Sequence, residues 1–185
     1  MRPRPVRRAR GRVGLLRGVR QDGRAVHCAW LRRQASVRLR RAQHVVGAVS
    51  VFAGHEKTVT YVRFDGRGRL VTSGTDGRHR LWELASGKEV RAYRGHANAR
   101  SFVGMSVWRS GGLIGCGSES NEVFFTTSGG APIWVQSFAG RTEEEEEAKA
   151  FVSAVCWREV SEDECALLAG GSDGMVQVYA GRRKV

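Results

Sequence analysis

The stretch GHEKTVTYVRFDGRGRLVTSGTDGRHRLWE, residues 54–83, decides the fold of this chain. In order, it holds a Gly-His pair, a strand that ends in an aromatic residue, a small-residue turn that carries an acid, and a second aromatic-ended strand. The pattern returns at Gly95-His96, followed by FVGMSVWRS, CGSESN and a final FF. A third copy lacks the Gly-His pair but keeps FVSAVCWRE, GGSDGM and Tyr179. The two Gly-His pairs are 41 residues apart, and the turn acids of the first two copies are 43 apart.

Repeats of this length, each with four strands, are typical of WD-repeat β-propeller blades, which serve as binding surfaces far more often than as catalysts. We therefore predict an all-β chain, a partial WD-repeat propeller with about three blades of an expected seven. Open arcs leave apolar blade faces in water, so residues 47–185 alone are expected not to form a stable monomer. From apolar runs bounded by glycine we expect strands at 45–52; at 58–64, 69–74, 78–84 and 88–93; at 102–108, 112–117, 122–127 and 132–138; and at 151–157, 165–170 and 175–180.

Four residues of the first copy are predicted to form a structural tetrad: His55, Thr72, Asp76 and Trp82. Their side chains can make one buried hydrogen-bonded chain that locks the turn to the strands, since buried polar groups need partners. The second copy offers Glu119 at the turn, and apolar packing must replace much of the network there. A catalytic His/Asp/Thr group is the alternative interpretation, but the repeat already explains these positions.

Charge divides the chain into two parts. Residues 1–46 contain fourteen Arg, no Lys and one acid, so they carry the whole net charge of +13, while residues 47–185 are neutral. We predict that 1–46 is an Arg-rich leader, disordered or non-native and dispensable for the propeller, because it has little apolar periodicity. A targeting segment, or an arm that binds nucleic acid through phosphate neutralisation, is the alternative.

Other features favour no additional chemistry. Cys28, Cys116, Cys156 and Cys165 never fall at two-residue spacing, so no zinc motif, other metal site or cofactor is predicted. We expect buried free thiols at the three cysteines of the repeats. No apolar run approaches the roughly 18 to 20 residues that span a bilayer, so we expect a soluble, intracellular protein. The acidic run 143–147 is expected to be a solvated loop, with a partner-binding loop as the alternative.

Several phrases of the repeats resemble one family in particular. They are GHEKTVTYVRF (54–64), GHANARSFVGMSV (95–107), CGSESNEVFF (116–125) and FVSAVCWRE (151–159). In this order they are similar to the C-terminal blades of the constitutively photomorphogenic E3 ubiquitin ligases and their suppressor-of-phytochrome-A relatives. The resemblance covers residues 50–180. It implies a seven-bladed propeller that follows a RING finger and a coiled coil and recruits substrates and photoreceptors carrying a Val-Pro motif, often among acidic residues.

The resemblance also implies two peptide-binding residues. Lys57 matches the family's peptide-contacting Lys, and Phe102 matches an aromatic residue that packs against the Val-Pro pair. A loop ammonium suits an acidic ligand flank, and an aromatic ring suits proline. The alternatives are a solvated loop Lys and a core Phe. One departure is Ala99, which stands where the family has a Glu, so a basic group on the ligand would lose its partner.

The predicted function is a protein-interaction module, the substrate or peptide receptor part of a RING-type E3 ubiquitin ligase, without catalysis of its own. The implied partners are photoreceptors, transcription factors and ubiquitin-ligase subunits in the nucleus or cytoplasm, with no membrane and no nucleic acid. A WD-repeat scaffold unrelated to ubiquitin is one alternative. The other is a basic nucleic-acid-associated protein, whose binding through the leader would fall steeply with salt.

Overall fold

A computed structural model describes the backbone of residues 13–19, 25–31, 34–41, 50–127, 132–138, 150–161 and 163–182, with side chains from residue 51 onward except 132–134. The regular structure of these residues is entirely β-strand, arranged in four antiparallel sheets. A helix able to span a membrane is not found among them.

Each sheet is built from strands that follow one another along the chain. The first contains β1 (Val13–Val19), β2 (Ala25–Leu31), β3 (Gln34–Arg41) and β4 (Ser50–Ala53). The second contains β5 (Val59–Phe64), β6 (Arg69–Gly74), β7 (Arg78–Glu83) and β8 (Glu89–Tyr93). The third contains β9 (Met105–Trp108), β10 (Leu113–Cys116), β11 (Glu122–Thr127) and β12 (Pro132–Ser137). The fourth contains β13 (Val152–Glu159), β14 (Glu164–Gly171) and β15 (Val176–Arg182).

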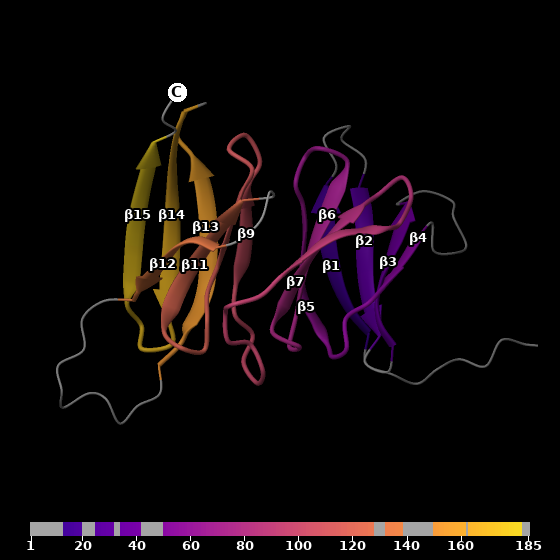
Figure 1. Cartoon of the computed structure of the whole chain (residues 1–185), viewed down its shortest axis with the longest axis horizontal. Coiled ribbons are helices and arrows are strands. Elements are labelled where there is room, and N and C mark those ends of the chain that lie inside the picture. Colours follow the sequence, from indigo (N-terminus) through magenta and orange to yellow (C-terminus); the bar gives the residue numbers. More distant parts are fainter. Residues whose placement is uncertain are drawn as a thin grey trace, which may run out of the picture.

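The sheets lie side by side in chain order, from β1–β4 at one end to β13–β15 at the other (Figure 1). Their first strands adjoin, since β5 contacts both β1 and β9, and β9 contacts β13. This is the arrangement of propeller blades, in which the first strand of each blade is innermost.

Apolar residues from facing sheets form the core. Alternate strand residues point to opposite faces, so Leu70 and Trp82 pack with Phe52 on one side of the second sheet. Val71 and Leu81, their chain neighbours, pack against the third sheet on the other side. Another cluster joins the third and fourth sheets through Val123, Phe125, Phe138, Val152, Leu167 and Ala169. Burying such side chains contributes about 1.5–3 kcal/mol each, which holds the blades together.

The first sheet differs from the expectation for residues 1–46. Strands β1, β2 and β3 lie within the segment predicted to be a disordered leader, and β3 pairs with β4 from Ser36↔Ala53 to Leu39↔Ser50. The reason is visible in VRLR (37–40), where apolar residues alternate with Arg at the period of a strand. The prediction of disorder rested on the high arginine content of the segment and did not take this alternation into account. Residues 1–12, 20–24, 32–33 and 42–49 and the acidic run 143–147 lie outside the described residues.

The strands of the later blades lie close to the predicted ranges. One strand boundary differs from the prediction, and so does the burial of one cysteine. β9 begins at Met105 and not at 102, because Phe102 belongs to a loop. Cys156 is exposed, so the expectation of a buried thiol was wrong there, whereas Cys116 and Cys165 are buried and free. Along β13 exposed and half-buried residues alternate, and Cys156 falls on the exposed side.

Candidate functional site

The turn between β6 and β7 is tied to the loop before β5 by the side chains of the predicted tetrad. His55 Nδ1 lies 3.0 Å from both carboxylate oxygens of Asp76, and His55 Nε2 lies 2.7 Å from Thr72 Oγ1. Trp82 Nε1 donates to the same hydroxyl at 2.8 Å. His55, Thr72 and Trp82 are buried, so each bond forms away from competing water.

The donors in this chain can be assigned from chemistry. An ionised carboxylate only accepts, so His55 Nδ1 carries the proton and donates it to Asp76. Trp82 Nε1 only donates, which leaves the Thr72 proton for His55 Nε2 at 2.7 Å or for the Arg80 carbonyl at 3.5 Å. The shorter contact favours donation from the Thr72 hydroxyl to His55 Nε2.

The Asp76 carboxylate also fixes the loop that carries Lys57. Its Oδ2 accepts the backbone N–H of Glu56 at 3.0 Å. Burial raises the pKa of Asp76, but the hydrogen bonds from His55 and from the Glu56 N–H outweigh it, so the pKa lies below its ordinary value of 3.8. Asp76 is therefore ionised at neutral pH and holds residues 55–57 in place, with Lys57 exposed.

In the second repeat the turn acid holds a different group. Glu119 Oε1 accepts the backbone N–H of Arg100 at 2.6 Å and that of Ser101 at 2.5 Å. Partial burial raises the pKa of Glu119, but the hydrogen bonds from these N–H groups lower it by more. The pKa of Glu119 therefore lies below its ordinary value. The carboxylate thus fixes the loop directly before Phe102.

Phe102 is held in an exposed position at the end of this loop. Its side chain is 60 % exposed, whereas its neighbour Val103 is 0 % exposed. Core packing, the alternative interpretation of Phe102, is therefore excluded. Glu119 holds the backbone of the loop before this ring, so the aromatic side chain is accessible from solvent.

The loops that carry Lys57 and Phe102 lie at the same end of their sheets. Glu56 bonds to Asp76 in the β6–β7 turn, and a Cβ added to Gly77 of that turn would lie 3.8 Å from the His96 carbonyl oxygen. Asn98 of the second loop reaches back to β6, where its Nδ2 lies 3.5 Å from Ser73 Oγ. The β6–β7 turn therefore stands between the two loops and contacts both.

Arg100 is a candidate residue that sequence reasoning missed. It is exposed, two positions before Phe102, and its backbone is fixed by Glu119. Ala99, at the position where the family has a Glu, is also exposed. The only available signal was charge: the loop ANARSF contains Arg and no acid.

Comparisons with known proteins agree with this architecture. Residues 47–83 match the family model described as WD domain, G-beta repeat. Over 132 residues the chain is 53 % identical to WD repeat-containing protein RUP2 of Arabidopsis thaliana, covering 71 % of this chain and 36 % of that protein. It is 39 % identical to the E3 ubiquitin-protein ligase COP1 of Pisum sativum, covering 70 % of this chain and 19 % of the ligase. Protein SPA1-RELATED 4 of Arabidopsis thaliana is 39 % identical, with 68 % of this chain and 16 % of that protein covered.

This chain is a WD-repeat protein related to the COP1, SPA1-related and RUP proteins. The predicted family resemblance is confirmed. The chain spans about a third of the length of RUP2.

The fold of this WD-repeat chain also matches a solved structure. One chain of the Mitotic Checkpoint Complex superimposes with a TM-score of 0.70 at 15 % sequence identity, covering 90 % of this chain and 48 % of that one. At this identity the likeness concerns the fold alone. Together with the four antiparallel sheets it confirms the predicted all-β, partial propeller.

Proposed function

We propose that this chain contributes a peptide-binding face of a WD-repeat propeller, and that the face takes Val-Pro segments flanked by acidic residues. The observation that carries the proposal is Phe102, which is 60 % exposed on a loop held by Glu119. The relationship to an E3 ubiquitin-protein ligase and to SPA1-related proteins supports a role in partner recognition for ubiquitin conjugation in light signalling.

The side chain of Phe102 offers the apolar part of such a face. An aromatic ring gives proline a flat surface, and the ring loses little conformational entropy because Glu119 already orders the loop before it. Binding then requires no new ordering of this segment, which favours affinity.

Positive charge supplies the second part. Lys57 and Arg100 are exposed on the adjoining loops. Arg78 is less available, because its guanidinium lies 2.7 Å from Glu56 Oε1. Exposed cations beside an apolar anchor favour acidic flanks and speed encounter more than they strengthen the final complex. Ala99 offers no partner to a basic ligand group, which shifts the preference further toward acidic segments.

The proposed role is recognition and not catalysis. The residues that most resemble a catalytic set are His55, Thr72 and Asp76. Their side chains are hydrogen-bonded to one another in the tetrad. We propose that ubiquitin transfer belongs to other parts of the assembly and that the chain acts in the nucleus or cytoplasm.

Fluorescence anisotropy with labelled peptides tests this role. One peptide carries Val-Pro with acidic flanks, a second has neutral flanks, and a third has Ala in place of Pro. We expect Phe102→Ala to weaken binding of the Val-Pro peptides by about 1 to 3 kcal/mol, or about 5- to 150-fold. Lys57→Glu should weaken the acidic-flanked peptide more than the neutral one.

Two matched variants serve as controls. Val90→Ala removes an exposed apolar side chain from β8, and Lys88→Glu reverses an exposed charge before that strand. Neither should change affinity. The proposal fails if Phe102→Ala and Lys57→Glu leave Val-Pro affinity unchanged in a folded chain. Equal binding of the Ala peptide would instead indicate a WD-repeat scaffold that recognises acidic proteins without this motif.

A further inference from the structure

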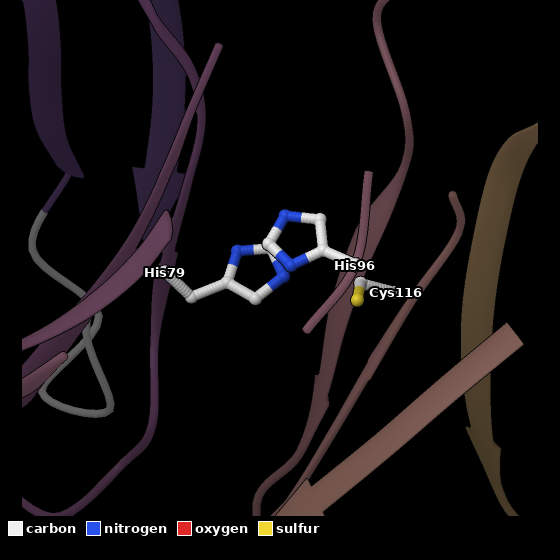
Figure 2. Close-up of side chains that lie close together, drawn as sticks. All are labelled: His79, His96 and Cys116. Carbon is white, nitrogen blue, oxygen red and sulfur yellow. The ribbon is translucent and has the colours of Figure 1, made fainter. Parts of the chain in front are cut away.

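Three metal-ligating side chains meet between the second and third sheets. His79 comes from β7, His96 from the loop after β8, and Cys116 from the end of β10. One ligand atom from each lies within 4.8 Å of the others, and all three residues are buried. Figure 2 shows His79 reaching from one side toward His96 and Cys116 on the other.

The histidines of this cluster lack hydrogen-bond partners. Both ring nitrogens of His79 and Nε2 of His96 are buried without any partner among the described residues. A buried polar atom left unsatisfied destabilises the fold, and most native proteins avoid such atoms. A neutral imidazole has one nitrogen lone pair, so the two histidines offer two lone pairs beside a free thiol, a donor set that suits a metal ion.

The protonation states suit a metal ion. Burial lowers the pKa of His79 well below its ordinary value, and burial lowers the pKa of His96 to about 4 although Asp76 and Glu119 oppose the shift. An imidazole binds a metal ion in its neutral form, through a nitrogen lone pair. Burial raises the pKa of the Cys116 thiol, so a cation has to displace its proton on binding.

We propose that His79, His96 and Cys116 are ligands of a structural transition-metal site that binds Zn²⁺. Two imidazoles and one thiolate are borderline-soft donors that suit zinc, with a water molecule as the fourth ligand. The balanced step is the exchange of the Cys116 proton for a zinc–sulfur bond, which releases one H⁺ to solvent.

The geometry requires one modest movement. The imidazole rings are stacked, with centroids 3.9 Å apart and planes 2° from parallel. Ring lone pairs lie in the ring plane, so one ring has to turn out of the stack for both to face one ion. Zn–N bonds of about 2.0–2.1 Å and Zn–S bonds of about 2.3 Å place tetrahedral ligand atoms about 3.3–3.6 Å apart. From separations of up to 4.8 Å, the ligand atoms therefore have to draw in by at most about 1.2–1.5 Å through rotation of the side chains.

The bound ion would join two blades. His79 belongs to the second sheet and Cys116 to the third, while His96 lies on the connection between them. The ligands are 17 and 20 residues apart, so they form no short motif, and the sequence expectation of no metal site did not consider this arrangement. Neighbouring blades supply the site only when they pack.

Cobalt binding to the 185-residue chain tests the proposal. Thiolate-bound Co²⁺ gives a sulfur-to-cobalt charge-transfer band in the near ultraviolet, which carboxylates cannot produce. We expect one Co²⁺ per chain with this band, displacement by one Zn²⁺, and a higher melting temperature with Zn²⁺. Cys116→Ala and His79→Leu should each weaken binding more than about 100-fold, since even the loss of a group that only orients a ligand costs 10- to 100-fold.

Cys165→Ala is the matched control, because Cys165 is also a buried free thiol but lies outside the cluster. It should keep the band. A folded wild-type chain without the band overturns the proposal, and so does a band that survives Cys116→Ala, which would point to another cysteine of the chain. If Cys116→Ala and His79→Leu do not fold, the wild-type chain still decides the matter: a melting temperature unchanged by one equivalent of Zn²⁺ contradicts a structural site.

Discussion

Replacing Thr72 by Val tests whether the tetrad stabilises the second blade. Val fits the volume of Thr but cannot form hydrogen bonds. Trp82 Nε1 would lose its acceptor at 2.8 Å, and His55 Nε2 would lose its donor at 2.7 Å. Thr72 is 0 % exposed, so no water replaces the hydroxyl without displacing the core. Two buried atoms left unsatisfied at about 1–3 kcal/mol each give an expected loss of about 2–6 kcal/mol.

Thr72→Ser supplies the reference. It keeps the hydroxyl and removes one methyl group, for which about 1 kcal/mol is expected. Urea unfolding of each variant, followed by circular dichroism as well as tryptophan fluorescence, gives the free energies, with equal m values required for comparison. Circular dichroism matters because Trp82 itself belongs to the network. If Thr72→Val is no less stable than Thr72→Ser, the network does not stabilise the blade and the reasoning is refuted.

Two further changes test other contacts. The pKa of Asp76 is lowered in the fold, so the stabilising effect of its carboxylate is complete above about pH 5 and declines as pH falls below 3.8 toward the folded pKa. The difference in unfolding free energy between wild type and Asp76→Asn should therefore shrink over that range. A difference independent of pH would contradict the assignment. A Cβ on Gly104 would lie 2.6 Å from Val155 N, so Gly104→Ala should cost about 1–3 kcal/mol by forcing the third and fourth sheets apart. The control is Gly170→Ala, whose Cβ would meet only Ala154 Cβ at 3.9 Å, so its free energy of unfolding should be nearly unchanged. Thermal melts of both variants give the comparison.

The sequence predicted best what a single repeat contains. The strands of residues 59–93 follow from alternation and glycine turns, and the tetrad residues lie within 27 positions of one another along the chain. The strand pattern alone did not predict the exposure of Phe102, because FVGMSV reads as one apolar strand and the loop before it is held by Glu119 from the next turn. A count of charges also concealed β1–β3, whose pairing depends on the backbone and on alternation within an Arg-rich segment.

The histidine cluster depends on contacts between repeats, and the turn acids of the first two repeats bond to different groups. His55 is held by the turn acid Asp76, whereas Glu119, at the corresponding turn, bonds to the backbone N–H groups of Arg100 and Ser101. His96 is therefore released from its own turn and stacks on His79 of the preceding blade. One exchange of partner thus has two consequences. It orders the loop before the exposed Phe102, and it leaves His96 in the cluster with His79 and Cys116.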